Sequence, residues 1–269
     1  MQVHGVDFSG SAEPGEDIWL TTGEWDGQRL RVTDARPASE AFDASGREAV
    51  LAGLREFVDD GGVSGLDFSF GLPRPVLPES VDSWATSLQW VREREYDDAL
   101  AAQADWKDRA RASDADGVEL KRATDRPVGA SSPYSFITRY QTFHGMCDLL
   151  WPLVDAGRVS VEPVAPTDAD ATLCEIYPAG TLRALGLPDR KYKDDAKYPD
   201  GPEKREAILE GLVDWGAEVP DWIAERLLED PEGDALDSLV AAVATARAVD
   251  GNFAVEDERY DPVEGYIYV

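Results

Sequence analysis

Residues 63–70 read VSGLDFSF, a run of apolar and small residues with a single acid, Asp67, inside it. The run has the length and the aromatic and β-branched content of a buried strand, and Gly71-Leu72-Pro73 ends it. A carboxylate inside an apolar strand is costly to bury unless it is paired or coordinates a metal. This stretch therefore bears on both the fold and the candidate site.

The sequence before this strand predicts three further strands and one helix. In the helix, apolar residues recur at helical spacing from Val50 to Val58, and Ser45 with Glu48 resembles a capping box. The three strands are residues 2–8, 17–22 and 28–33. The predicted order of the first seventy residues is strand, strand, strand, helix, strand.

Residues 74–156 have helical patterns and no strong strand, and Phe136 to Trp151 trace one long apolar helix face. Further along, strands are predicted at 158–164 and 171–177, helices at 179–186, 203–215, 220–229 and 234–249, and a short β-like tail at 265–269. Three strands and a helix, then strand, helix, strand, helix, is the order expected of an RNase H-like core.

We therefore predict an α/β fold with a single RNase H-like domain over residues 1–269. It would have a mixed β-sheet flanked by helices, with the core in 1–73 and 157–269. Residues 74–156 would be a largely helical insertion between the fourth and fifth strands, covering one side of the site.

The charge of the chain is extreme, with 54 acidic residues against 26 basic ones and a formal net charge of −28. The acids are scattered, and the basic residues comprise only six lysines beside twenty arginines. One interpretation is a protein that repels nucleic acid. The other, which the lysine scarcity favours, is a haloarchaeal-type surface suited to a salt-rich cytoplasm, where charge repulsion is screened. On this interpretation the net charge says little about partners.

The sequence gives no sign of export or of a membrane. No apolar run approaches the roughly 18 residues of a spanning helix, and residues 1–7 lack the features of a secretory signal. Only Cys147 and Cys174 are present, which argues against a disulfide framework or a cysteine metal site. We expect a cytoplasmic protein; its oligomeric state is not predicted.

The acid inside an apolar stretch recurs elsewhere in the chain. Asp7 lies in the first strand, Glu175 in the strand at 171–177, and Asp237 beside the apolar stripe of the last helix. Asp7 could instead begin a turn, and Asp234 could simply cap its helix. Carboxylates of this kind suit Mg²⁺ or Mn²⁺ rather than zinc, and two such ions about 3.5–4 Å apart could activate water against a phosphodiester.

Four phrases carry a family resemblance: GVDFSG at 5–10, LDFSFGLP at 66–73, CEIYPA at 174–179 and DALDSLVAA at 234–242. Together they resemble domain-of-unknown-function family 429 (DUF429), whose members are described as predicted nucleases with an RNase H fold. The Asp-x-x-Asp that opens the last helix also resembles metal-binding acids of Holliday-junction resolvases. Glu175 is a departure from this pattern, because most RNase H-like nucleases have no such acid at the end of the fifth strand.

We accordingly predict a metal-dependent nuclease that cleaves DNA or RNA by a two-metal mechanism. Asp7, Asp67, Glu175 and Asp237 would be catalytic. Asp7 would bridge both ions, Asp67 and Asp237 would each hold one, and Glu175 and Asp234 would complete the ligand set.

Residues 92–139 are nearly neutral and are either an ordinary salt-bridged helix surface or a phosphate-contacting segment. For the second case the predicted substrate contacts are Ser9, Lys121, Arg122, Arg126 and Arg139, with Trp84, Trp90 and Trp106 available for stacking on bases. His144, on an apolar helix face, is expected to be structural.

Two other functions stay open on this sequence. One is a non-catalytic RNase H-fold protein that binds metal or nucleic acid. The other is an actin-like phosphotransferase, with residues 7–11 as its first phosphate-binding turn. The second needs a duplicated domain with another Gly-rich loop, and no internal repeat is visible.

Overall fold

One mixed sheet of eight strands organises the protein, as shown by a computed structural model of residues 1–269. The strands are β1 (Gln2–Asp7), β2 (Trp19–Trp25), β3 (Leu30–Pro37), β4 (Gly62–Asp67), β5 (Val159–Glu162), β6 (Ala171–Ile176), β7 (Ala217–Glu218) and β8 (Ile267–Tyr268). Their order across the sheet is β5-β6-β4-β1-β2-β3-β7, and β8 pairs with the end of β6. β1, β2 and β3 are antiparallel neighbours, whereas β4 is parallel to β1 and β6 is parallel to β4.

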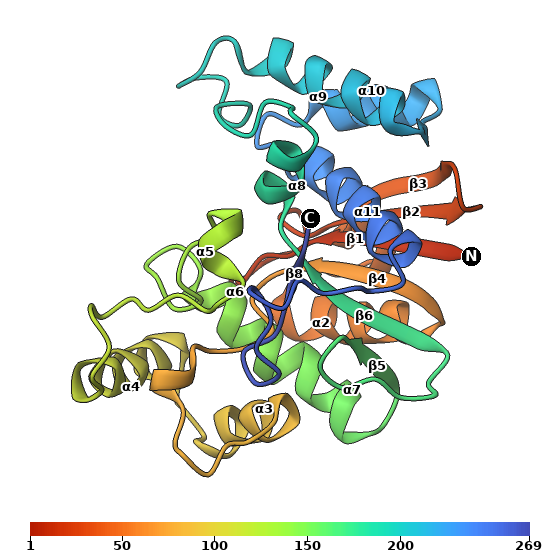
Figure 1. Cartoon of the computed structure of the whole chain (residues 1–269). Coiled ribbons are helices and arrows are strands. Elements are labelled where there is room, and N and C mark those ends of the chain that lie inside the picture. Colours follow the sequence, from red (N-terminus) through yellow and green to blue (C-terminus); the bar gives the residue numbers. More distant parts are fainter.

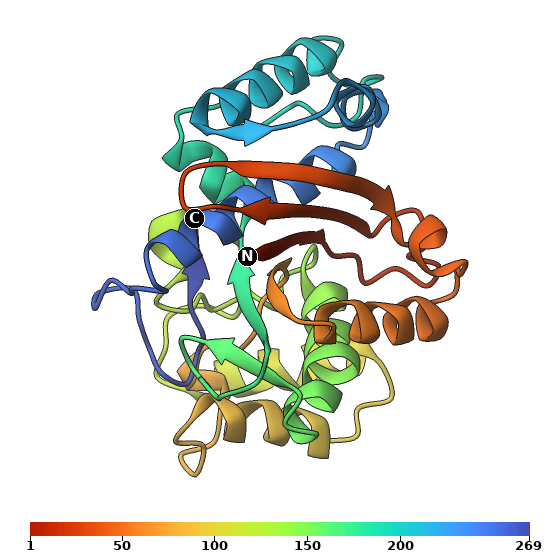
Figure 2. The same cartoon turned by 90° about the vertical axis from the view of Figure 1, so that its right-hand side faces the viewer.

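Helices cover both faces of this sheet (Figure 1). They are α1 (Ala38–Phe42), α2 (Arg47–Asp59), η1 (Arg74–Val76), α3 (Trp84–Glu93), α4 (Ala99–Ala112), α5 (Asp125–Val128), α6 (Arg139–His144), η2 (Gly145–Leu150), α7 (Trp151–Asp155), α8 (Pro178–Ala184), α9 (Gly201–Trp215), α10 (Asp221–Glu229) and α11 (Asp234–Asp250). α11 lies along one face, and α2 lies on the other. Figure 2 shows α9 and α10 together beyond β3.

Alternation along β1 divides the hydrophobic core between the two faces. Val3 packs in the cluster that includes Leu239 of α11, whereas Val6 packs in the cluster that includes Leu54 of α2. Successive side chains of a strand point to opposite faces, so Asp7 shares the α11 face with Val3.

No helix of the structure combines the length and the apolar composition needed to cross a membrane.

Two glycines allow α11 to lie directly on the sheet. A Cβ atom at Gly5 would collide with the backbone of α11, and one at Gly65 would collide with the Thr245 side chain. The Thr21 and Ser238 hydroxyls, 2.7 Å apart, further fix the helix against β2. This close packing brings the first turn of α11 to the carboxyl ends of β1 and β4.

The predicted α/β class, a mixed sheet flanked by helices, is confirmed, and residues 74–156 contain helices but no strand. Two local predictions were wrong. α2 begins after Gly46 without a side-chain cap, so Ser45 and Glu48 form no capping box. Phe136 and Ile137 precede α6 and are each 74% exposed, because the helix starts at Arg139 and its apolar face does not extend back to them.

Candidate carboxylate site

Asp7 and Asp67 end neighbouring parallel strands and are Cα partners in the sheet register. Adjacent strands lie about 4.8 Å apart, and in-register residues point to the same face, so the two carboxylates lie side by side. Asp7 is buried, with 7% of its surface exposed, and Asp67 is half-buried. Neither carboxylate has a hydrogen-bond donor or an ion-pair partner within bonding distance, so neither is compensated by a direct contact.

The environment of this pair disfavours negative charge. Burial raises the pKa of Asp7 well above its ordinary value; Lys193 lowers it, and Asp234, Asp237 and Asp67 raise it. Burial, followed by the charge of Asp237, raises the pKa of Asp67 to about 8. Four carboxylates thus share this region with one nearby lysine.

That lysine lies between the two acids of α11. The Lys193 Nζ atom is 2.7 Å from Asp237 Oδ2 and 2.9 Å from Asp234 Oδ1. The Tyr192 hydroxyl donates to the other Asp237 oxygen over 2.7 Å. Burial by itself would lower the pKa of Lys193, but Asp237, Asp7 and Asp234 raise it well above its ordinary value, so the ammonium stays charged.

Sequence reasoning missed Lys193 and Tyr192. They lie in the segment between α8 and α9, far along the chain from β1, and no periodic pattern marks them. The available signal was the scarcity of lysine: three of only six lysines occur at 191, 193 and 197.

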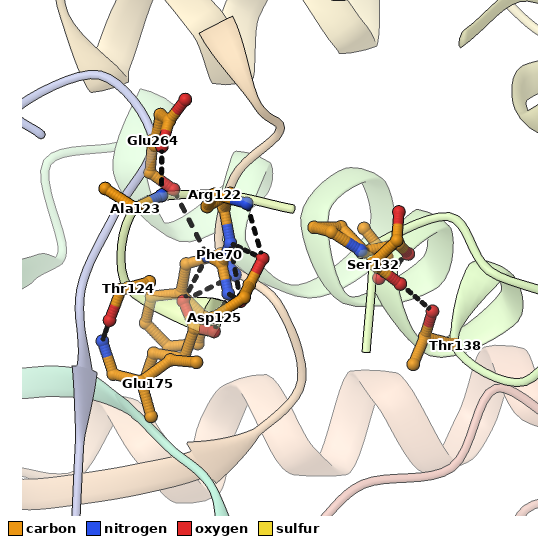
Figure 3. Close-up of polar contacts among 12 residues, drawn as sticks. Phe70, Arg122, Ala123, Thr124, Asp125, Ser132, Thr138, Glu175 and Glu264 are labelled. Carbon is orange, nitrogen blue, oxygen red and sulfur yellow. Dashed lines mark hydrogen bonds and ion pairs between the residues drawn. The ribbon is translucent and has the colours of Figure 1, made fainter. Parts of the chain in front are cut away.

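Glu175 belongs to a different group of charges (Figure 3). Its Oε2 atom accepts from Arg122 Nη1 at 2.7 Å and from the Phe70 backbone N–H at 3.0 Å. Arg122 is fully buried and also binds Asp125 at 2.8 Å. Burial raises the pKa of Glu175, and Arg122 lowers it. Glu175 and Arg122 therefore neutralise each other in the interior. This pairing does not fit the predicted role of Glu175 as a metal ligand or the predicted contact of Arg122 with substrate.

The C-terminal segment closes over this buried group. The Glu264 carboxylate accepts from the backbone N–H of Ala123 at 2.7 Å (Figure 3). It also accepts from the backbone N–H of Arg74 at 2.6 Å, and the Thr124 hydroxyl accepts from the Ile267 N–H at 2.9 Å. Arg122 thus lies beneath the chain terminus and the loop before α5.

The other predicted substrate contacts are scattered. Ser9 accepts from the Ser11 N–H at 3.2 Å, which makes a turn directly after β1. Lys121 is half-buried and Arg126 is exposed. Arg139 lies over the rings of Phe136 and Tyr140, with its guanidinium carbon 4.6 and 4.9 Å from the centroids.

The predicted stacking role fails for two of the three tryptophans. Trp84 and Trp106 are fully buried, so no base can reach them. Trp90 is half-buried and lies beneath the guanidinium groups of Arg94 and Arg109.

A cavity of about 290 Å³ opens beside Asp67. It lies between the end of β4, the end of β6 and helix α6 with its preceding residues. Its polar lining includes Asp67, Ser69, Thr138, Gln141 and also Glu175, whose charge contributes to raising the pKa of Asp67. One wall of this cavity therefore comes from within residues 74–156, on the side where the sequence predicts a cover for the site.

A family model described as "Protein of unknown function (DUF429)" matches residues 5–260. The chain belongs to the DUF429 family. The matched range includes Asp7, Asp67, Lys193 and both acids of α11, so the whole carboxylate site lies within the family's region. No curated protein and no solved structure matches this DUF429 chain.

The site as it stands has no complete set of metal ligands. No three His, Cys, Asp or Glu side chains of the chain are grouped so that they could hold one ion. The unpartnered pair of Asp7 and Asp67 nevertheless fits Mg²⁺, which usually keeps several waters and takes one or two carboxylates together with substrate phosphates. Asp234 and Asp237 do not fit a second ion in this arrangement, because Lys193 holds both.

Proposed function

We propose that this DUF429 chain hydrolyses phosphodiester bonds of nucleic acid, with Asp7 and Asp67 holding a Mg²⁺ or Mn²⁺ ion. The observation that carries the proposal is the pair of desolvated carboxylates without donors at adjoining strand ends. Such a pair is unfavourable by itself, and a divalent cation would compensate its charge. Functional sites are where carboxylates with strongly raised pKa values concentrate.

The arrangement of the sheet supports an RNase H-like core. β1, β2 and β3, then α2 and β4, then β6 and α11 follow the predicted element order, with 74–156 in the place of the insertion. The added β5 joins β6 directly, without a helix between them. In this core the ends of β1 and β4 and the start of α11 meet, where the nuclease acids are expected.

The structure supports one ion better than the two predicted from the sequence. When bound, such an ion polarises a phosphoryl oxygen and lowers the pKa of an attacking water. Asp7 and Asp67 would position it at the carboxyl ends of β1 and β4. In place of a second ion, the Lys193 ammonium supplies positive charge next to the same carboxylates.

The remaining residues would bind and orient the substrate. Asp234 and Asp237 hold Lys193 in place, and the Tyr192 hydroxyl in turn fixes Asp237, so that the charge of Lys193 is positioned before a phosphate arrives. Ser69 and Thr138 line the adjoining cavity and offer hydroxyl groups to a sugar or phosphate. The exposed Phe136, covered on one side by Arg139, offers a face for an unpaired base.

The test is cleavage of labelled single-stranded, duplex and branched DNA and RNA with Mn²⁺ or Mg²⁺, and with EDTA. Asp7→Asn keeps the side-chain shape and removes the charge. Loss of a residue that only orients a metal ligand costs about 10–100-fold in activity, so loss of this direct ligand should cost more than about a hundredfold. Asp214→Asn, on the exposed side of α9, is the matched control and should cleave as the wild type does.

Two outcomes would count against this function. Equal cleavage by Asp7→Asn and wild type would exclude the proposed site. A wild type that binds Mn²⁺ and nucleic acid but cleaves none of the substrates would favour the non-catalytic binding protein.

A further inference from the structure

A second cavity, of about 700 Å³, lies between α2, the end of α3 and the helical run η2–α7. It is lined by other residues than the carboxylate site. Three arginines line it: Arg47 and Arg55 from α2, and Arg92 from α3.

The three arginines are unusual in this acidic chain. Fourteen of its twenty arginines have a carboxylate oxygen within 4.0 Å. Arg47, Arg55 and Arg92 have none, although 54 acids are available in the sequence. Three guanidinium groups around one cavity, none of them paired with a carboxylate, indicate a site for an anion that is not part of the chain.

Two of these guanidinium groups are fixed by backbone carbonyls. Arg47 donates to the carbonyl oxygens of Ser11 at 2.8 Å and Gly10 at 3.1 Å. Arg55 donates to the Asp148 carbonyl at 2.6 Å. A guanidinium has five N–H donors, so each keeps donors for a ligand while its orientation is held. This matches the fixed fork geometry with which arginine binds phosphate.

The acids of the cavity leave the arginines available. Asp148 Oδ2 is 2.7 Å from His144 Nδ1, so this carboxylate is bound to the imidazole. Glu48 and Asp155 are exposed to solvent. His144 is 8% exposed, and Nδ1 is its one ring nitrogen that bonds to the protein. The π-helical turn Gly145–Leu150 follows His144, and such turns are frequent at functional sites.

One wall of the cavity is apolar. Leu51 and Cys147 are buried there, and Trp151 is half-buried with its ring available to a planar group. A ligand that combines a phosphate with an aromatic ring would use both the arginines and this wall.

We propose that the cavity binds a terminal phosphate monoester carried on an aromatic group, such as a nucleotide. Arg47, Arg55 and Arg92 would hold the phosphate, and Trp151 would contact the ring. The phosphate could belong to a free mononucleotide or to the phosphorylated end of a strand. This inference does not depend on nuclease activity.

The test is isothermal titration calorimetry of the full chain in EDTA and low salt, with inorganic phosphate, AMP, adenosine and a 5′-phosphorylated tetranucleotide. We expect phosphate and AMP to bind, and adenosine not to bind. Binding of the tetranucleotide as tightly as AMP would assign the site to strand ends, and binding of AMP alone would assign it to free nucleotides. Asp7→Asn should bind AMP as the wild type does, which separates this cavity from the carboxylate site.

Matched variants identify the residues. Arg92→Gln removes an exposed side chain that has no hydrogen bond or ion pair, so the fold should be unaffected; it should weaken AMP and phosphate binding about tenfold. Arg55→Gln should also weaken the binding of AMP and of phosphate about tenfold. Trp151→Leu should weaken the binding of AMP but not that of phosphate. Arg111→Gln, on the exposed surface of α4, is the control. Equal affinity of wild type and Arg92→Gln for AMP, or binding of adenosine as tight as AMP, would overturn the proposal.

Discussion

A substitution at Glu175 distinguishes a carboxylate that stabilises the fold from one that binds metal. We consider the substitution Glu175→Gln, which preserves shape and removes the charge. In the wild type this carboxylate accepts two hydrogen bonds from Arg122, at 2.7 and 2.5 Å, and one from the Phe70 N–H at 3.0 Å. Both side chains of the pair are almost completely buried.

The magnitude follows from the burial of Arg122. Removing one partner of a buried ion pair costs about 3–5 kcal/mol, because the other charge is left without its partner. Asp125 continues to bind Arg122 in the variant, so we expect a loss near the lower end, about 3 kcal/mol. If Glu175 were instead a metal ligand among repelling carboxylates, removing its charge would stabilise the metal-free protein.

The assay is urea denaturation without metal, followed by Mn²⁺ titration of the folded variant. We expect a lower free energy of unfolding, an unchanged denaturant slope and an unchanged Mn²⁺ affinity. Glu162→Gln, at the half-buried end of β5, has no ion pair and should change stability by less than about 0.5 kcal/mol. A Glu175→Gln variant as stable as the wild type, with weaker Mn²⁺ binding, would refute this reasoning.

Three further predictions concern the carboxylate site and the surface. Lys193→Gln frees Asp234 and Asp237 and removes a positive charge that competes with the metal ion, so the Mn²⁺ affinity measured by calorimetry should rise about tenfold. The exposed Lys197→Gln is the control. A lower Mn²⁺ affinity of Lys193→Gln would contradict the role given to Lys193. Because the pKa of Asp67 rises from 3.8 to about 8 on folding, the folded state binds more protons, and metal-free stability should fall from pH 4 to pH 8. Asp67→Asn should flatten that slope in urea denaturation, and an equal slope in both proteins would argue against desolvation of Asp67. If the acidic surface reflects a salt-rich cytoplasm, the melting temperature should rise between low salt and molar KCl, since screening relieves repulsion; an unchanged or lower value would remove that explanation.

The elements that sequence predicted well are those set by local patterns. The apolar spacing of α2 and the apolar run that starts at Val63 depend on neighbouring residues only, and both appear in the structure, although the strand ends at Asp67 and not at Phe70 as predicted. The direct pairing of β5 with β6 could not be predicted, because partner choice between strands depends on the whole sheet. The start of α6 was placed too early, since exposed apolar residues precede it in the same spacing.

The site shows the same limit. Asp7, Asp67 and Glu175 look alike in sequence, each an acid among apolar strand residues. The difference is Arg122, 53 residues before Glu175 in the chain, which neutralises Glu175 and leaves the other two acids unpartnered. Lys193 likewise meets Asp237 only through folding, so its role has no local signature.

The central claim is that Asp7 and Asp67 together hold a divalent ion. A crystal structure soaked in Mn²⁺ tests it most directly, because the ion is located by its anomalous scattering. We predict one peak between the carboxyl ends of β1 and β4, with an oxygen of each of the two aspartates at about 2.1 Å, as expected for a Mg²⁺-type site. Absence of a peak there, or a peak held by Asp234 and Asp237 without Asp7, would contradict the claim.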